Sequence, residues 1–432
     1  MIHVASQLVE NVAIPKFFKI KQKFPRPVIT PEEIPGIISS LLSEEKFSAQ
    51  VKPGMRIAIT AGSRGVANVA VLTKAIADFC KSRGAHPFVV PAMGSHGGAT
   101  AEGQKEVLTN YCITEDFVGC PILSSMEVTH IGYTEDGRDV YIDKNAAEAD
   151  GIIISCRIKP HTAFRGTYES GIMKMMAIGI AKQAGAERCH DQGFKNMAKN
   201  VPLYGKAILK NANILFAVPT LENAYDETCK IVAVNHDEVE EMEPPLLQEA
   251  YSYMPRILVD DCDVLVVDEI GKNFSGDGMD PNITGTFCTP YASGGIKSQR
   301  VCVLDLAPET HGNGIGVGMA NATTQRVYRQ LDLDAMYTNA ITCTVLHGAR
   351  IPCVMNTDKE AIQICIRTCI EIDKTNPKIV RIPNSLHIEH ILLSEAYYEL
   401  MKDNPNIEIE SEPAPLSFDT EGNLTDIEPR VR

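Results

Sequence analysis

An alternation of short apolar runs and helical stretches between residues 50 and 220 is the feature that most constrains the fold. Residues 56–60, 86–91 and 151–156 form aliphatic runs of the length and composition of buried strands. Between the first two, apolar residues recur at helical spacing over 67–81. A strand, a helix and a second strand in this order predict a βαβ unit and a mostly parallel sheet.

A second α/β region is expected from residue 256 onward. Strands are predicted at 263–269 and 301–306, and a helix at 359–372. The acidic stretch 235–255 contains two consecutive prolines and is the predicted boundary. We therefore predict an α/β protein of two domains. Residues 1–255 would hold a mostly parallel, Rossmann-like sheet, and residues 256–432 a smaller α/β domain. The tail after residue 404 would either be loosely held or pack back on the first domain.

Composition limits the classes of partner. With 44% hydrophobic and 22% charged residues, the chain is a well-folded globular protein. Its net charge of −14 argues against nucleic acid and against an anionic membrane surface as partners. No apolar run approaches the roughly 20 residues that span a bilayer, and the 13 cysteines are scattered, as reduced thiols are. A small-molecule substrate and a cytoplasmic location are expected.

Two glycine-containing loops follow predicted strands, at the place where open α/β sheets bind ligands. The first carries Ser63 and Arg64. Its glycines let backbone N–H groups approach a ligand, and Arg64 offers a fork for a carboxylate or phosphate. A surface arginine in an ordinary turn explains this loop equally well. In the second loop, glycines before and after His96 leave its ring uncrowded, which favours a functional histidine over a packed one.

A third segment leaves strand 151–156 and continues into a predicted helix over 169–182. It places His161 at the same sheet edge as Arg64 and His96, followed by Lys174 between methionines near the helix start. Such surroundings disfavour the ammonium form and make the amine a better nucleophile. Taken alone, Lys174 would be an exposed lysine on an amphipathic helix.

His190 lies further along the chain and by itself would be a surface histidine. A metal-ligand role needs further donors, and no nearby His, Cys or carboxylate completes a zinc-type set. A metal at His190 would therefore take its other ligands from elsewhere, for instance from a cofactor.

Together these elements resemble the lactate racemase family, whose members use a nickel-pincer nucleotide cofactor. The resemblance covers most of residues 50–200. It consists of a turn with arginine, a glycine-flanked histidine, a Pro-His pair, a lysine and a later histidine, in that order. It implies that Lys174 binds the thioamide of the cofactor (pyridinium-3-thioamide-5-thiocarboxylic acid mononucleotide nickel) and that His190 ligates nickel. The cofactor would supply a carbon and two sulfurs, and such soft donors with one imidazole suit square-planar nickel.

The resemblance also implies a racemase or epimerase that inverts C2 of a 2-hydroxy acid through a transient 2-keto acid. One of His96 and His161 would remove the hydroxyl proton while the 2-hydrogen leaves as hydride, and the other would supply a proton when hydride returns. Arg64 would meet the substrate carboxylate, and Ser63 and Arg64 would contact the cofactor. Residues 1–255 would bind cofactor and carry catalysis, and 256–432 would close over the substrate.

The chain departs from the family pattern between His161 and Lys174, where the segment is longer and carries Glu169 and Ser170 in place of a glycine-rich turn. Covalent attachment of the cofactor to Lys174 therefore stays open. Lys272 is the candidate substrate contact from the second domain, although an exposed loop lysine explains it equally well. The substrate is expected to be a 2-hydroxy acid other than lactate. Separate biosynthetic enzymes would supply the cofactor, and a homo-oligomer is left open.

Two other functions remain open. A zinc or manganese hydrolase or lyase could use His96, His161 and His190 as ligands. A non-catalytic protein that carries a nickel cofactor would need only Lys174 and His190. A nicotinamide dehydrogenase is disfavoured because no dinucleotide fingerprint follows any predicted strand. The histidines expected to be structural are His86, His130, His347 and His311, of which His311 lies in a glycine-rich loop.

Overall fold

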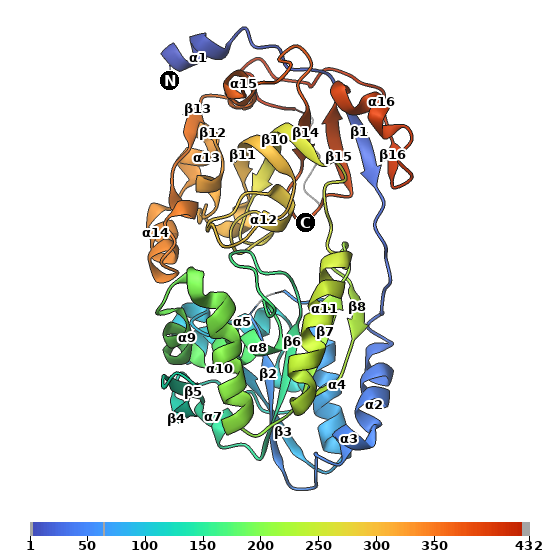
Figure 1. Ribbon diagram of the computed structural model, residues 1–432, viewed down its shortest axis with the longest axis vertical. Helices are drawn as coiled ribbons and strands as arrows, with labels where there is room; N and C mark the ends of the chain where they lie inside the picture. Colours follow the sequence, from blue (N-terminus) through green and yellow to red (C-terminus); the bar gives the residue numbers. More distant parts are fainter. Residues whose placement is uncertain (1–2, 64, 426–432) are drawn as a thin grey trace. The chain divides into compact units, whose positions relative to one another are not determined.

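The computed structural model describes residues 3–63 and 65–425, so Arg64 lies outside the described residues. The chain divides into two compact units. One comprises residues 25–254, and the other joins residues 1–24 to residues 255–432. Figure 1 shows that each unit is built around its own sheet. Among the described residues, no helix is both long enough and apolar enough to cross a membrane.

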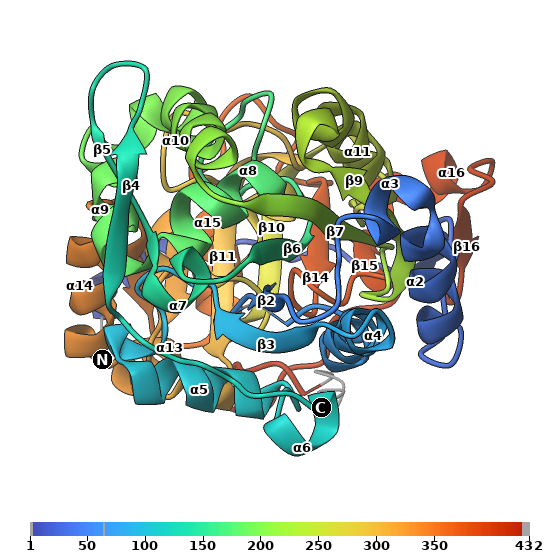
Figure 2. The ribbon, with the colours of Figure 1, turned by 90° about the horizontal axis from the view of Figure 1, so that it is seen from below.

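The unit of residues 25–254 contains a sheet with the strand order β3-β2-β6-β7-β8. Its first four strands are parallel, and β8 and the short β9 pair with β7 in the antiparallel direction. Figure 2 shows these strands lying across the unit, with the separate hairpin β4–β5 at one side. The strands are β2 (Arg56–Ala61), β3 (His86–Pro91), β4 (Val128–Tyr133), β5 (Asp139–Asp143), β6 (Gly151–Arg157), β7 (Ile214–Glu222), β8 (Thr228–Ile231) and β9 (Val234–Asn235).

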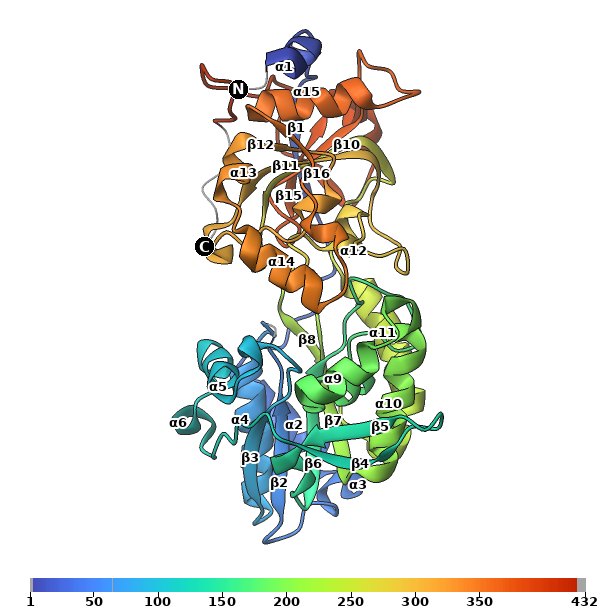
Figure 3. The same ribbon diagram turned by 90° about the vertical axis from the view of Figure 1, so that its left-hand side faces the viewer.

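Helices cover both faces of this sheet (Figure 3). Alternate side chains of a strand point to opposite faces, so Ile57 and Ile59 pack with α2 and α4, whereas Ala58 packs on the side of α8 and α10. Burial on both faces explains why the strands read as continuous apolar runs. The helices are α2 (Ile34–Ser43), α3 (Glu45–Ser48), α4 (Val69–Ser82), α5 (Ala101–Asn110), α6 (Glu115–Val118), α7 (Lys144–Ala147), α8 (Ile172–Lys174), α9 (Lys182–His190), α10 (Met197–Asn211) and α11 (Val239–Tyr253).

The predicted boundary at 235–255 is not a linker. Most of it forms α11, which contains both Pro244 and Pro245 and buries Leu246 and Leu247 in the core of the first unit. Each proline removes one backbone donor, but the buried apolar face holds the helix in place. The two units separate after Met254, one residue from the predicted division between residues 255 and 256.

The other unit contains an eight-stranded sheet with the order β13-β12-β11-β10-β14-β15-β1-β16. Strands β13 to β14 of this order are parallel, and the remaining three pair antiparallel. The strands are β1 (Phe17–Gln22), β10 (Asp261–Ile270), β11 (Lys297–Leu306), β12 (Ala322–Thr324), β13 (Cys353–Met355), β14 (Ile379–Ile382), β15 (His390–Ser394) and β16 (Ile407–Ile409). The helices are α1 (His3–Val9), α12 (Pro281–Thr284), α13 (Gln325–Gln330), α14 (Leu333–Thr342), α15 (Asp358–Thr368) and α16 (Tyr398–Met401).

The two ends of the chain meet in this second unit. The sequence analysis placed residues 1–24 in the first domain, whereas β1 lies between β15 and β16 and exchanges backbone hydrogen bonds with both. The tail, expected to be loosely held or to return to the first domain, pairs with β1 through Ala414 and packs Leu424 beside α15. Apolar alternation locates a strand but does not specify its partner, so the sequence alone could not assign β1 to its sheet.

The fold class is as predicted, a mixed α/β protein with mostly parallel sheets. Residues 56–60, 86–91, 151–156, 263–269 and 301–306 all lie within strands, and α4 and α15 cover most of two predicted helices.

Candidate active site

Three loops of the first unit leave one edge of its sheet. Ser63 follows β2, His96 follows β3 and His161 follows β6. These strands are adjacent and parallel in the order β3-β2-β6, so their carboxyl ends meet at the same edge, where ligands of such sheets bind. The sequence-predicted residues Ser63, His96 and His161 therefore share one edge.

His96 contacts Ser63 directly. The Ser63 Oγ lies 2.5 Å from Nδ1 of the His96 ring. The backbone oxygen of Ser63 accepts a hydrogen bond of 3.2 Å from the Tyr111 hydroxyl, which helps to hold the backbone of Ser63 in place. The imidazole thus has a hydroxyl partner on one nitrogen.

A buried lysine that the sequence analysis did not single out supports the His96 loop. Lys182 is fully buried, and its Nζ donates to the backbone oxygen of Pro91 (2.6 Å) and to the Gln104 Oε1 (3.0 Å). Gln104 is equally buried and donates through Nε2 to the backbone oxygens of Gly94 and His96. The Lys182 ammonium is therefore linked to the backbone of His96 through the side-chain amide of Gln104.

Lys182 pairs with a buried carboxylate, Asp143, at 3.1 Å. Burial lowers the pKa of Lys182 and raises the pKa of Asp143, while the attraction between the two charges opposes both shifts. Lys182 also has a φ of 56°, a left-handed conformation that is uncommon for a lysine. Asp143 additionally accepts the backbone N–H of Ala146 at the start of α7, so this pair ties α7, α9 and the His96 loop together.

The His161 loop is organised by a different carboxylate. Glu169 is 2% exposed, and its oxygens accept the backbone N–H of His161 (2.7 Å), the backbone N–H of Gly166 and the Tyr251 hydroxyl. Arg165 forms an ion pair with Glu169 and donates to the backbone oxygen of His161. The segment between His161 and Lys174 is therefore held by hydrogen bonds within itself and to Tyr251 of α11.

Inside this loop the His161 ring accepts a hydrogen bond. The backbone N–H of Ala163 donates to Nδ1 of His161 over 3.0 Å. The ring also packs on Phe164, with ring centroids 4.4 Å apart. Since Nδ1 is an acceptor here, the proton of the neutral imidazole sits on Nε2.

Lys174 stands at a break in helical geometry. It is the last residue of the one-turn α8, and residues Met175–Ile180 continue as a π-helix. The predicted helix over 169–182 is thus shorter and irregular, and π-helical turns occur frequently at functional sites. Met175 reaches the first loop, because a Cβ added to Gly62 would lie 3.4 Å from its Cε.

The start of α8 is held by Glu243 from α11. This carboxyl is 1% exposed and accepts the backbone N–H of Met173 over 2.9 Å. Burial raises the pKa of Glu243 to about 8. A Cβ on Gly171 would lie 2.1 Å from Glu243 Oε1, so only glycine fits there.

His190 is the last residue of α9. Its Nδ1 lies 2.7 Å from the backbone oxygen of Ala186, which can only accept, so Nδ1 carries the ring proton and Nε2 keeps a lone pair. Burial lowers the pKa of His190, and the nearby charge of Lys174 lowers it further. The neutral ring that a metal requires is therefore the favoured state.

Neighbouring groups join His190 to the His96 loop. Gly94 donates its N–H to the backbone oxygen of Gly179, and a Cβ on Gly94 would lie 3.6 Å from the Cβ of Ala186, the residue that bonds His190. The side-chain amide of Asn200 donates a hydrogen bond to the backbone oxygen of Cys189. Lys174, His190 and the His96 loop thus belong to one packed assembly.

The described residues offer a metal one oriented imidazole, that of His190. Across residues 3–63 and 65–425, no three His, Cys, Asp or Glu side chains gather as a metal site. The described residues therefore do not form the three-histidine site of His96, His161 and His190. His190 offers one imidazole nitrogen with its proton placed away from a ligand, and a metal there needs further donors from a bound group.

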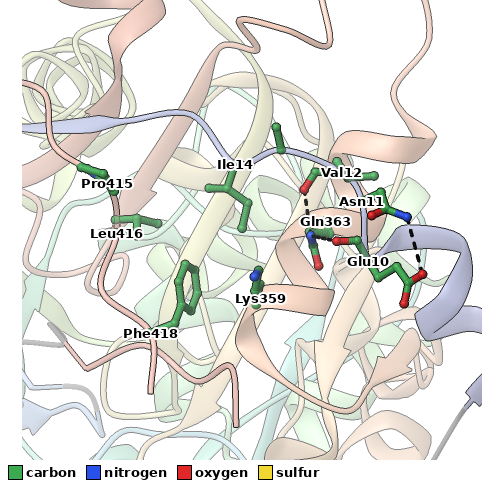
Figure 4. Close-up of a pocket in the computed structure, with 10 residues that line it drawn as sticks. Glu10, Asn11, Val12, Ile14, Lys359, Gln363, Pro415, Leu416 and Phe418 are labelled. Atoms are coloured by element: carbon green, nitrogen blue, oxygen red, sulfur yellow. Dashed lines mark hydrogen bonds between the residues drawn. The ribbon is translucent and has the colours of Figure 1, made fainter. Parts of the chain in front are cut away.

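Lys272 belongs to the other unit and follows β10. Its Nζ donates to the Asn339 Oδ1, which also accepts from Asn313. His311 adopts a left-handed φ of 49° at the end of a single 3-10 turn. A hollow of about 350 Å³ in this unit is lined by both polar and apolar side chains (Figure 4). It contains none of the predicted site residues and is lined by Glu10, Asn11, Val12, Ala13, Ile14, Lys359, Gln363, Pro415, Leu416 and Phe418.

The sequence analysis did not single out Lys182, Asp143 and Glu243. Each is a charged residue buried by partners distant in sequence. A helical lysine or glutamate in the sequence reads as exposed, and no local spacing marks these three. Glu169 was named in the sequence analysis only as a departure from the expected family pattern, without a structural role.

Parts of this chain are similar to known proteins in sequence and in fold. Residues 14–201 match the family model described as the lactate racemase N-terminal domain. Among solved structures, the lactate racemase apoprotein from Thermoanaerobacterium thermosaccharolyticum is similar, with 13% sequence identity and a TM-score of 0.51. That likeness covers 85% of this chain and 94% of that chain. A search of curated proteins gave no match.

Fold and site define an α/β protein of two sheet-bearing units, with Ser63, His96 and His161 in loops that leave the carboxyl edge of the first sheet. Residues 14–201 belong to the lactate racemase family, which confirms the resemblance seen in the sequence. At this level the chain is similar to racemases and epimerases.

Proposed function

We propose that this protein is a nickel-pincer nucleotide-dependent racemase or epimerase that inverts C2 of a 2-hydroxy acid. The observation that carries the proposal is His190, a half-buried imidazole whose Nδ1 donates to the backbone oxygen of Ala186 and whose pKa is lowered by burial and by the charge of Lys174. One imidazole without companion ligands suits a metal whose other donors come from an organic cofactor.

His190 would ligate nickel through Nε2, and Lys174 would hold the thioamide end of the cofactor. When bound, the cofactor supplies a hydride acceptor and donor for C2 of the substrate. The charge of Lys174 lowers the pKa of His190, which keeps the ring deprotonated at Nε2 for the metal. Ser63 and Arg64 would contact the cofactor.

The remaining residues would handle the substrate. His96 and His161 share the sheet edge and would manage the proton of the 2-hydroxyl, a role for which imidazole is suited. Arg64 would bind the substrate carboxylate, and Lys272 is a second candidate for a substrate contact. We infer a cytoplasmic protein, without nucleic-acid or membrane partners, that receives its cofactor from separate biosynthetic enzymes.

The test is metal analysis and absorption spectroscopy on protein co-expressed with the enzymes that make the cofactor. Stoichiometric nickel with a cofactor band is expected in the wild type. His190→Ala should lose both, whereas His86→Ala, at an exposed position at the start of β3, should keep both. The loaded protein is then tested for inversion of a panel of 2-hydroxy acids.

Zinc or manganese in place of nickel, unaffected by His190→Ala, would contradict the proposal. Stoichiometric nickel without inversion of any 2-hydroxy acid would identify a carrier of the cofactor. In that case the His96→Ala variant would bind nickel as well as the wild type does.

A further inference from the structure

The hairpin β4–β5 lies outside both large sheets and runs beside α9, the helix that ends in His190 (Figures 1 and 3). At the start of α9, Lys182 pairs over 3.1 Å with Asp143, the last residue of β5. In the middle of α9, a Cβ added to Gly185 would lie 3.3 Å from the backbone oxygen of Tyr141 in β5. The hairpin therefore supports the first half of α9 directly.

The last turn of α9 is held by side chains of α10. The final carbonyls of a helix have no partner within the helix and need one from elsewhere. The Tyr204 hydroxyl donates to the backbone oxygen of Arg188 over 3.2 Å, and the Asn200 Nδ2 donates to that of Cys189 over 2.9 Å. Asn200 is fully buried and Tyr204 nearly so. The two residues before His190 are thus fixed through their backbone.

Arg138, in the turn between β4 and β5, joins the hairpin to these contacts. Its Nη2 donates to the Asn200 Oδ1 over 3.1 Å, and its guanidinium lies over the Tyr204 ring, 5.1 Å from the ring centroid. Asp136 accepts from the Arg138 Nε over 3.0 Å, which fixes the direction of the guanidinium. Since Arg138 binds the amide oxygen of Asn200, the amide nitrogen faces Cys189.

These contacts bear on the tautomer of the His190 ring. The proton on Nδ1 is bonded to the backbone oxygen of Ala186, one turn earlier in α9, over 2.7 Å. This bond needs the helical geometry of the last turn, and helix ends whose carbonyls lack partners fray. Fraying would carry the ring away from Ala186 and let the proton occupy either nitrogen. Holding the Cys189 carbonyl therefore preserves the tautomer that has its lone pair on Nε2.

We propose that the hairpin β4–β5 braces α9, and that Arg138 and Asn200 are positioning residues for His190, whose Nε2 they keep available to a metal. This inference rests on the proposed function and deepens it. It assigns the support of the proposed nickel ligand to a part of the chain outside the loops at the sheet edge.

The ring state is tested in the full-length apoprotein with ¹⁵N-labelled histidine at about pH 8, where imidazole is neutral. Long-range proton–nitrogen spectra distinguish the two neutral tautomers, and His190→Gln assigns the signal. We expect the Nδ1–H tautomer alone in the wild type. Asn200→Asp keeps the size of the side chain and its contact with Arg138 but removes the donor to Cys189, so its signal should average both tautomers. Asn110→Asp, the same change at the exposed end of α5, should match the wild type.

Two milder variants serve if Asn200→Asp does not fold. Tyr204→Phe removes only the donor to Arg188, and Arg138→Gln removes the cation that holds the Asn200 amide. Each should move the His190 signal in the same direction by a smaller amount, in protein whose circular dichroism matches that of the wild type. A His190 signal unchanged in every folded variant would overturn the inference, as would a wild-type ring with its proton on Nε2.

Nickel retention by the loaded protein gives the second readout. Loss of an outer partner of a metal ligand typically weakens metal binding by about 10–100-fold. Asn200→Asp should therefore release nickel to excess EDTA at least about tenfold faster than the wild type, and Asn110→Asp at the wild-type rate. Equal release rates in the two variants would refute the positioning role and leave the proposed function standing.

Failure of the proposed function gives a different pattern. A wild type that takes up no nickel, while its apoprotein shows the tautomer change in Asn200→Asp, would refute the proposed function. The hold of the hairpin on the His190 ring would still stand in that case.

Discussion

Glu243 is almost completely removed from water, and its carboxyl meets the chain just before Lys174. Its Oε1 has no hydrogen-bond partner among the described residues. Burial raises its pKa from 4.5 to about 8, so the folded protein keeps this carboxyl neutral at pH 7, whereas the unfolded chain ionises it. A proton is therefore released on unfolding.

This linkage gives a prediction for stability. A raised pKa in the folded state contributes stability that is complete below pH 4.5 and is lost as the pH rises to about 8. Each unit of difference is worth roughly 1.4 kcal/mol. Glu243→Gln stays neutral, so its unfolding free energy in urea should rise relative to the wild type as the pH increases through this window. Glu241→Gln, on the exposed side of the same helix, should follow the wild type. A constant difference for Glu243→Gln would refute the raised pKa.

The sequence could indicate which histidines are chemically interesting, but not what surrounds them. His96 was recognisable because glycines flank it, and His161 because it follows a buried strand. Their partners Ser63 and Ala163 define opposite hydrogen-bonding directions, which only atomic positions reveal. The functional roles of all these residues stay predictions.

Among the elements, α9 carries two very different charged residues at its ends. Lys182 begins it inside the core, and His190 ends it at the site. The preceding π-helix shifts the register between Lys174 and His190, which a regular helical spacing over 169–182 did not anticipate. Strands were easier to predict, because burial on both faces leaves an unmistakable apolar run.

Removing the charge of Lys182 should be costly. Lys182→Met leaves Asp143 buried without its cation and Gln104 without a donor to its oxygen, and a broken buried pair costs about 3–5 kcal/mol. Urea unfolding should show that loss, and Asp143→Asn in the same chain should recover part of it. Lys195→Met, at an exposed lysine, should change stability by less than about 0.5 kcal/mol. An equally stable Lys182→Met would mean that the pair contributes nothing.

At the scale of the whole molecule, the first unit is continuous in sequence and the second is not. Residues 25–254 contain both faces of their own core. The second sheet needs β1 from the start of the chain, because β16 pairs with β1 alone. Two domains could be predicted from length and patterning, but strand pairing between residues 17–22 and residues near 390 and 408 leaves no local trace in the sequence.

Residues 25–254 are inserted in the sequence between the two segments of the second unit, and this arrangement predicts how fragments behave. Residues 25–254 expressed alone should unfold in one cooperative transition and resist proteolysis. Residues 255–432 alone should be unfolded or aggregated, because the loss of β1 exposes the edges of β15 and β16. Adding a peptide of residues 1–24 should restore folded signal in circular dichroism. A stable fragment 255–432 without the peptide would contradict the role given to β1.

The same arrangement sets the order in which the two units can fold during synthesis. A ribosome delivers β1 first, yet its neighbours β15 and β16 emerge only after residues 390–394 and 407–409 have been made. Residues 25–254 are complete long before that, and domains fold as units as they emerge. The histidine-bearing unit can thus be finished while β1 is still unpaired, because β15 and β16 have yet to be made.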